Sequence, residues 1–240
     1  MFPIILAAGD SSHLGYPKPL ALFNGRTALE LAVENCAGVE TPIVVLGHRA
    51  AAIRGHVPDG ARVVINRDWR NGQLSSLLAG LRMVPRGEAF LLYPVDQPLL
   101  TAALVARLVR AFQKRAAGKL IVMPRKGKRA GHPILCSEEL RSELEHANTA
   151  REVVYRDDRR VQFVPVSDVS IWADFDSLWT YRRCVRMFLR QRKPRKISSE
   201  AIPSYQPAEK ILRRSMRTKS PSHKYSLGGR SFGSDIKSPQ

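Results

Sequence analysis

A glycine-containing loop near the start of the chain carries residue types that bind phosphate. The segment 6–20 reads LAAGDSSHLGYPKPL and follows an apolar run. Gly9 and Gly15 would let the backbone approach a ligand and adopt positive φ. Successive backbone N–H groups in such a turn form a concave anion site, Ser11 adds a hydroxyl, and Lys18 adds a mobile positive charge. These groups predict a nucleoside triphosphate site, and a surface loop with a solvated lysine is the alternative.

Three aspartates in two distant segments are candidate cation ligands. Asp96 lies in YPVDQPLL, and Asp174 and Asp176 stand one residue apart in WADFDSLW. Mg²⁺ is commonly held by one or two carboxylates together with substrate phosphates. If the strands are parallel, Asp96 lies at the same sheet edge as the loop. The alternative for Asp96 is a helix-capping or turn aspartate before Pro98. On a strand, Asp174 and Asp176 would point to one face and could share a cation, whereas on a turn one of them would cap the following helix.

Two further segments place polar groups where a ligand could contact them. The segment 71–81, NGQLSSLLAGL, has the pattern of a helix whose first turn carries Gln73, Ser75 and Ser76. Free N–H groups at a helix N-terminus favour anions and hydrogen-bond acceptors. The Gly-His-Pro at 131–133 interrupts an extended run. It is interpreted either as backbone turned toward a ligand or as a structural histidine beside proline.

The elements that must position these groups alternate in type. Six runs are continuously apolar and rich in β-branched residues, as expected of strands covered on both faces. They span 2–8, 42–47, 62–66, 89–94, 119–124 and 161–166. Amphipathic helical stretches occur at 27–36 and 101–117, and Thr101 is a candidate N-cap for the second. This alternation predicts an α/β layered fold with a largely parallel sheet.

Composition bounds the class of protein. The chain has 240 residues, 44% hydrophobic and 25% charged, which is long enough for a sizeable core and excludes a disulfide-stapled mini-protein. Its apolar runs are shorter than the roughly 20 residues that a membrane-spanning helix needs, so no membrane contact is predicted. Cys36, Cys136 and Cys184 lack paired spacing, and the N-terminus has no secretory pattern. We therefore expect reduced thiols and a cytoplasmic location.

Charge is concentrated near the C-terminus. Residues 187–240 hold 13 Lys and Arg against 3 Asp and Glu, a net charge of +10 out of +18 for the chain. The strand and helix pattern stops after Arg190, and the sequence becomes rich in Ser, Gly, Pro and Lys. Such a segment cannot bury enough apolar surface to offset its ordering entropy. We predict a folded domain over 1–190 and a basic, mostly disordered tail over 191–240, whose charge would support contact with a polyanion.

Taken in order, five segments resemble the MobA-like NTP transferase family, and most closely its molybdenum cofactor cytidylyltransferase branch. The family pattern is LAAG-x-S-x-R-x-G-x-P-K, G-x-S-S-S-L-x-x-G-L, G-D-Q-P, G-H-P and D-I-D-T-P-E-D. This sequence has LAAGDSSHLGYPK, GQLSSLLAGL, VDQP, GHP and DFDS, and TAREVV at 149–154 resembles the family's G-A-R-x-x-L helix. The match covers about residues 2–186. It implies a three-layer α/β/α nucleotidyltransferase fold, Rossmann-like with a mostly parallel sheet, and transfer of a nucleoside monophosphate with release of pyrophosphate.

The resemblance also implies a set of site residues. The implied nucleotide-binding residues are Leu6, Ala7, Ala8, Gly9, Ser11, His13, Gly15, Lys18, Gln73, Ser75 and Ser76. The implied cofactor is Mg²⁺, held by Asp96 with Asp174 or Asp176. Lys18 and Asp96 are the implied catalytic residues. The implied acceptor contacts are Gly131, His132 and Pro133.

This sequence departs from the family pattern at four places. The motif Arg is His13, the Gly before Asp96 is Val95, the closing T-P-E-D is Ser-Leu-Trp-Thr at 177–180, and the Gly-Asp before the G-A-R helix is replaced at 146–148. An arginine is a permanently charged, bidentate phosphate ligand that a histidine replaces poorly. The change at position 13 therefore bears on catalytic rate more than on fold.

Three functions are compatible with these features. The leading hypothesis is Mg²⁺-dependent transfer of CMP from CTP to a phosphorylated acceptor such as the molybdopterin cofactor. The second keeps the fold but takes a sugar phosphate or alditol phosphate, since a fold specifies its acceptor poorly. The third is a degenerate, non-catalytic nucleotide-binding protein with a polyanion-binding tail.

Overall fold

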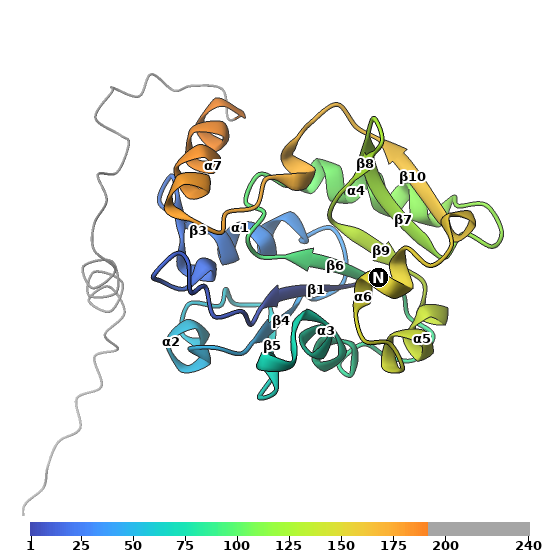
Figure 1. Ribbon diagram of the computed structural model, residues 1–240, viewed down its shortest axis with the longest axis horizontal. Helices are drawn as coiled ribbons and strands as arrows, with labels where there is room; N and C mark the ends of the chain where they lie inside the picture. Colours follow the sequence, from blue (N-terminus) through green and yellow to red (C-terminus); the bar gives the residue numbers. More distant parts are fainter. Residues whose placement is uncertain (192–240) are drawn as a thin grey trace, which may run out of the picture. The chain divides into compact units, whose positions relative to one another are not determined.

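A mixed β-sheet forms the centre of the described domain. The computed structural model describes residues 1–191, and the predicted tail from residue 192 on lies outside them (Figure 1). The strand order is β10-β7-β9-β6-β1-β4-β5. The strands are β1 (Phe2–Ala7), β4 (Ile43–Leu46), β5 (Arg62–Ile65), β6 (Phe90–Pro94), β7 (Ile121–Lys126), β9 (Ile134–Cys136) and β10 (Val161–Pro165). All six predicted strands are present.

Most strand pairs are parallel, as predicted. β1 pairs in parallel with both β4 and β6, β4 with β5, and β7 with β10. The exception is β9, which the sequence analysis did not identify and which runs antiparallel to both β6 and β7. A short strand β8 (Arg129–Ala130) also pairs antiparallel with β7. The β1–β6 register places Leu6 opposite Pro94, so the loops that follow these strands emerge side by side.

Helices cover both faces of the sheet, which gives the expected three layers (Figure 1). They are α1 (Ala28–Asn35), α2 (Ala50–Arg54), α3 (Gln73–Leu81), α4 (Ala102–Gln113), α5 (Arg141–Glu145), α6 (Ala150–Val154) and α7 (Leu178–Gln191). A small hairpin, β2 (Leu22–Phe23) with β3 (Arg26–Thr27), precedes α1. Thr27 caps α1 in a capping box with Glu30, and Thr101 caps α4 as predicted. Gln191, which the sequence analysis assigned to the tail, is the last residue of α7.

Strand periodicity divides the core in two. Ile5 of β1 packs in the cluster that also holds buried residues of α1, α4 and α7, whereas Ile4 packs with those of α3, α5 and α6. Successive residues of a strand point to opposite faces, so a strand covered on both faces is apolar throughout. Gly80 allows α3 to lie close to β1, because a Cβ at this position would collide with Ile4. The last turn of α3 therefore packs directly on β1.

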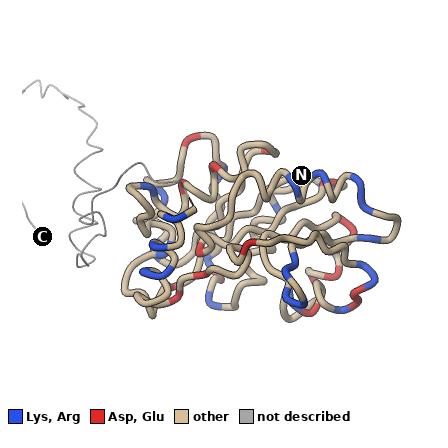
Figure 2. Tube along the Cα trace, turned by 90° about the horizontal axis from the view of Figure 1, so that it is seen from above, with Lys and Arg blue, Asp and Glu red and all other residues tan. Residues whose placement is uncertain are grey.

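The surface of the described domain is polar and mixed in charge. Figure 2 shows Lys and Arg spread over it with Asp and Glu among them. None of the helices within residues 1–191 has the length and apolar character that crossing a membrane requires.

Candidate active site

The loop after β1 closes on itself through a serine. The Ser11 hydroxyl accepts a hydrogen bond from the backbone N–H of Lys18 (3.0 Å), and the Ser11 carbonyl accepts one from Leu14 (3.0 Å). Positive φ occurs at Ser11 (55°) and Gly15 (77°). The expectation of positive φ at Gly9 is wrong, because Gly9 is not among the residues with a left-handed backbone. Gly9 instead has open space where a Cβ would point.

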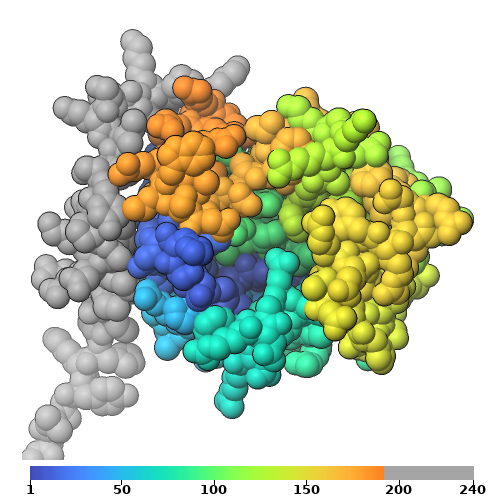
Figure 3. Space-filling view, in the orientation of Figure 1, coloured from blue at the N-terminus to red at the C-terminus, as the bar shows by residue number. Residues whose placement is uncertain are grey.

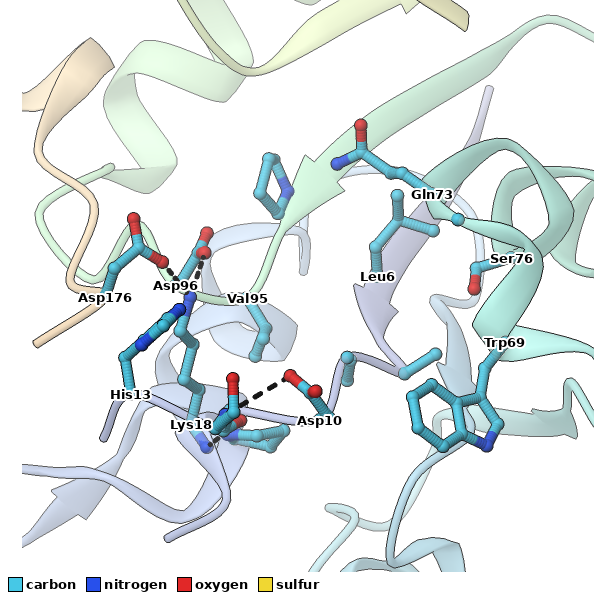
Figure 4. Close-up of a pocket in the computed structure, with 18 of the residues that line it drawn as sticks. Leu6, Asp10, His13, Lys18, Trp69, Gln73, Ser76, Val95, Asp96 and Asp176 are labelled. Atoms are coloured by element: carbon cyan, nitrogen blue, oxygen red, sulfur yellow. Dashed lines mark hydrogen bonds and ion pairs between the residues drawn. The ribbon is translucent and has the colours of Figure 1, made fainter. Parts of the chain in front are cut away.

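Lys18 joins the loop to two distant aspartates. Its Nζ donates to Oδ2 of Asp96 (2.9 Å) and to Oδ1 of Asp176, and Figure 4 shows the two carboxylates converging on the amine. Burial alone would lower the pKa of Lys18, but the charges of Asp96 and Asp176 outweigh it and raise the pKa. Lys18 is therefore a fully charged ammonium held between two anions.

The segment that carries Asp174 and Asp176 is irregular, so these residues do not share the face of a strand. Neither of them caps the following helix. The Ser177 hydroxyl accepts from the N–H of Thr180 (3.3 Å), and the Thr180 hydroxyl accepts from the N–H of Asp176 (2.9 Å). Between the two aspartates, Phe175 is fully buried. Neither carboxylate is thus used to cap the helix, and the backbone of the segment is anchored.

The surroundings of Asp174 destabilise the charged form of its carboxyl group. Partial burial, followed by repulsion from Asp176 and Asp96, raises the pKa of its carboxyl above the ordinary value, although Lys18 partly offsets this. Asp96, Asp174 and Asp176 carry three negative charges in this part of the site, against the single positive charge of Lys18. This excess of negative charge favours the binding of a further cation.

A cavity of about 420 Å³ opens at the carboxyl ends of β1 and β6. Figure 3 shows the surface hollowed there, with the N-terminal segment recessed. The predicted nucleotide-binding residues that line it are Leu6, Ala7, Ala8, Gly9, Ser11, His13, Lys18, Gln73 and Ser76. Asp96 and Asp176 line it too. We call it the first cavity.

Two residues of the predicted nucleotide set do not line the first cavity. Gly15 serves the turn of the loop. The Ser75 hydroxyl donates to the carbonyl of Gly72 (2.8 Å) and accepts from Asn66 (2.9 Å). Asn66 also donates to the Ser76 hydroxyl (3.0 Å). The buried Asn66 side chain therefore holds the first turn of α3 in place. Its position at the end of the predicted strand 62–66 was the signal in the sequence that could have identified this role.

Trp69 and Arg70 form a wall of the first cavity that sequence reasoning missed. A Cβ on Gly47 would lie 2.7 Å from Cβ of Trp69 and from the carbonyl oxygen of Ala8. Only glycine therefore lets the end of β4 pack against both. The Arg70 guanidinium lies 4.5 Å from the centre of the Trp69 ring, a cation–π distance. The remaining lining residues not predicted are Asp10, Ser12, Pro19, Gly72, Pro94 and Val95.

A second cavity of about 740 Å³ lies next to the aspartate segment. Of the predicted acceptor contacts, Gly131 and His132 line it and Pro133 does not. Asp174 lines this second cavity, as does Gln97. Its exposed basic lining residues are Arg125, Lys128, Arg129 and Arg151. Three of these arginines stack on aromatic rings, at 4.2 Å on Phe163, 4.7 Å on Trp172 and 4.9 Å on Tyr155.

The Gly-His-Pro segment has a structural role, and its contact with a ligand stays a prediction. A Cβ on Gly131 would collide with the carbonyl oxygen of Ile171, so the glycine is required by packing. The N–H of His132 donates to that same oxygen (3.1 Å), whereas its Nδ1 is buried without a partner among the described residues. Burial lowers the pKa of His132 to about 4, although the charge of Asp96 opposes the shift. The imidazole is neutral at pH 7.

The site fits a divalent cation only as a partner of a bound phosphate. Within residues 1–191 no group of three or more His, Cys, Asp and Glu side chains forms a metal cage. The Lys18 ammonium nevertheless shows that Asp96 and Asp176 converge on a single cation. Two carboxylates completed by substrate oxygens is a common arrangement for Mg²⁺. The donor set therefore suits the group that the sequence motifs imply.

Comparison with known proteins places this architecture among nucleotidyltransferases. The chain is 32% identical over 187 residues to the nicotine blue oxidoreductase of Paenarthrobacter nicotinovorans, covering 73% of this chain and 91% of that protein. It is 28% identical over 113 residues to a probable molybdenum cofactor guanylyltransferase of Geobacillus sp., covering 46% of this chain and 57% of that one. The manganese complex of Rv0371C from Mycobacterium tuberculosis superposes with a TM-score of 0.65 at 27% identity, over 77% of this chain and 97% of that one.

The family assignment rests on a match that spans most of the domain. The model of the MobA-like NTP transferase domain matches residues 3–163, from β1 to the middle of β10. This range includes the loop after β1, the start of α3, Asp96 and the Gly-His-Pro segment. The chain therefore belongs to the MobA-like NTP transferase family.

Proposed function

We propose that this protein transfers CMP from CTP to a phosphorylated acceptor, such as the molybdopterin cofactor, and releases pyrophosphate. The observation that carries the proposal is the position of the acidic cluster between two cavities. Asp96 lines the first cavity and Gln97 the second, while Asp176 lines the first and Asp174 the second. A triphosphate in the first cavity and an acceptor in the second would meet at these aspartates.

The reaction requires little covalent chemistry from the protein. An oxygen of the acceptor phosphate attacks the α-phosphorus, a new P–O bond forms, and the bond to the bridging oxygen breaks. The electron pair of that bond leaves with pyrophosphate. A phosphate nucleophile is already anionic, so no general base is needed. The protein contributes positioning and charge stabilisation.

Lys18 is the proposed catalytic cation of the chain. Its ammonium lies on the wall of the first cavity, where it would offset the negative charge that grows on the leaving pyrophosphate. The loop N–H groups and Ser11 would hold the phosphates, with His13 as a weaker contact than the arginine of the family motif. Gln73 and Ser76, at the start of α3, would lie near the base.

Asp96 and Asp176 are the proposed metal ligands, with Asp174 as the third carboxylate nearby. When bound, Mg²⁺ would neutralise charge on the phosphates. The ammonium of Lys18 bonds to the same two carboxylates, which supports a cation site at this position.

The second cavity has the charge that a phosphorylated acceptor requires. Four exposed basic side chains line it against two aspartates, Asp158 and Asp174. Stacking on aromatic rings holds three of the arginines, which lowers the entropy lost when a guanidinium binds an anion.

Pyrophosphate release with a panel of nucleotides and acceptors tests the proposal. CTP and GTP are each combined with molybdopterin, a sugar phosphate and an alditol phosphate in the presence of Mg²⁺ or Mn²⁺. We expect the highest kcat/KM with CTP and molybdopterin. Preference for GTP would reject the base, and preference for an alditol phosphate would favour the second acceptor class. Nucleotide binding without turnover on any acceptor would favour the non-catalytic alternative.

A redox enzyme is the second candidate, since the 32%-identical relative is named an oxidoreductase. Thiol chemistry from the described cysteines does not support it. Cys36, Cys136 and Cys184 are buried, and burial raises the pKa of each to about 12. The reactive form of cysteine is the thiolate, which is scarce at such a pKa. Oxidation of NADH or NADPH by the purified protein with an added two-electron acceptor dye, without pyrophosphate release from any NTP, would favour this candidate.

A further inference from the structure

Gln97 is a buried polar residue to which the proposed reaction assigns no role. It follows Asp96, and its residue is only 6% exposed. Its Oε1 has no hydrogen-bond partner among the described residues, although the residue lines the second cavity. An unpaired buried acceptor carries its full desolvation cost, and folded proteins satisfy the great majority of such groups. The unpaired oxygen therefore points to a ligand group that is missing from the free protein.

His132 supplies a second unpaired group to the same cavity. Its Nδ1 is buried and without a partner, while its backbone N–H is fixed by Ile171. A neutral imidazole has one nitrogen that donates and one that accepts. Two uncharged hydrogen-bonding side chains, from the loop after β6 and from the segment before β9, thus belong to one cavity.

Neutral and basic residues occupy different parts of the second cavity. Gln97 and Gly131 are buried, and His132 is mostly buried, so these residues form its floor. Arg125, Arg129 and the other basic side chains are exposed and form its rim. A ligand that only needed its phosphates bound would use the rim alone. The neutral floor requires a ligand whose body also makes hydrogen bonds.

We propose that Gln97 is a specificity-determining residue that recognises an uncharged hydrogen-bonding part of the acceptor, beside the contact of His132 that the sequence motifs already imply. Identifying this ligand with the acceptor rests on the proposed function. Because Oε1 of Gln97 can only accept, the acceptor presents an N–H or O–H donor to it. The substrate class is therefore a phosphorylated polyol or a phosphorylated heterocycle with amide or amino groups. Simple alkyl phosphates lack these donors and are rejected.

Ligand binding by the full-length protein tests this inference directly. The probes are ribitol 5-phosphate, a pterin carrying a phosphomonoester, and hexyl phosphate, which has the same charged group without donors. We expect at least one of the first two to bind about tenfold more tightly than hexyl phosphate in calorimetry. Equal affinities, or binding of none of the three, would overturn the inference.

The variant Gln97→Leu removes the unpaired oxygen at nearly constant volume. We expect it to abolish the discrimination against hexyl phosphate and to raise the acceptor KM about tenfold or more, with the CTP KM unchanged. The melting temperature should stay the same or rise, because an unsatisfied group has been replaced by an apolar one. Unchanged discrimination between the probes would overturn the inference.

Gln162→Leu is the matched control. Gln162 lies on β10 outside the second cavity, and its amide is satisfied by Ala111 (3.3 Å) and by the N–H of Ala116 (3.4 Å). This variant should lower the melting temperature and leave probe binding unchanged. Failure of the proposed function has a separate readout. Absence of pyrophosphate release, with discrimination that depends on Gln97, would reject the nucleotidyl transfer and leave the binding inference standing.

Discussion

The Nζ of Lys18 lies 2.9 Å from Oδ2 of Asp96, although 78 residues separate them in the sequence. The contact follows from the sheet, since β1 and β6 are parallel neighbours and the two residues lie in the loops that leave them. Asp176 reaches the same ammonium from the segment before α7. Three segments that are distant in the sequence therefore meet at the ammonium group of Lys18.

Substitution of Asp96 should abolish activity without unfolding the protein. Asp96→Asn keeps the shape but removes the charge that pairs with Lys18 and would hold the metal. We expect kcat to fall by about two to three orders of magnitude, as when a positioned electrostatic group is lost. Pyrophosphate release measures the rate, and circular dichroism checks the fold. Asp157→Asn, at a surface ion pair with Arg159, is the control, and full activity of Asp96→Asn would reject the assignment.

A methyl group on Gly9 should interfere with nucleotide binding alone. The position has open space for a Cβ and no left-handed backbone, so the fold accepts alanine, yet Gly9 lines the first cavity. Overpacking against a ligand typically costs about 1–3 kcal/mol. Gly9→Ala should therefore raise the nucleotide KM about tenfold at an unchanged melting temperature. Gly38→Ala, which also has free space but lies outside both cavities, should change neither value.

A methyl group on Gly131 should destabilise the fold. Its Cβ would collide with a backbone carbonyl, that of Ile171, which cannot move aside as a flexible side chain would. We expect Gly131→Ala to lose about 1–3 kcal/mol of unfolding free energy in urea titrations. Gly55→Ala, at the end of α2 with nothing close to its Cβ, is the control. Equal stability of the two variants would contradict the tight packing.

His132 should make stability depend on pH in the mildly acidic range. Its folded pKa is about 4 against an ordinary 6.5, so between these values the unfolded chain binds more protons. Stability therefore rises with pH from about 4 to 6.5, and is lost as pH falls through this window. The free energy of unfolding changes by up to about 3 kcal/mol across this window. His132→Asn should flatten the urea-derived profile there, and an unchanged profile would contradict the prediction.

The sheet was largely predictable because buried parallel strands are continuously apolar. All six such runs in the sequence became strands, and Thr101 became the predicted cap. β9 was missed because it has only three residues and its antiparallel partners, β6 and β7, are distant in sequence. Local pattern carries no information about such pairing.

The first cavity was predicted less completely than the sheet. Loop residues that directly follow β1 line it as expected, since their place is set by the strand. Ser75 does not, because its hydroxyl bonds to the backbone of Gly72. Trp69 was missed because its position depends on the tight approach of Gly47, a tertiary contact. The alternative for Asp176, a helix cap, was settled only by the bond between Ser177 and Thr180.

Phe175 has a consequence for how specificity can diverge in this architecture. The centre of its ring lies 5.4 Å from that of Phe23 and 5.8 Å from that of Tyr181. The neighbouring carboxylates line different cavities, Asp174 the second and Asp176 the first. A single buried ring thus lies between the two carboxylates, so a substitution there would disturb the linings of both cavities together. Substitutions at other positions of the two cavities, such as the arginines of the rim, would leave that arrangement intact.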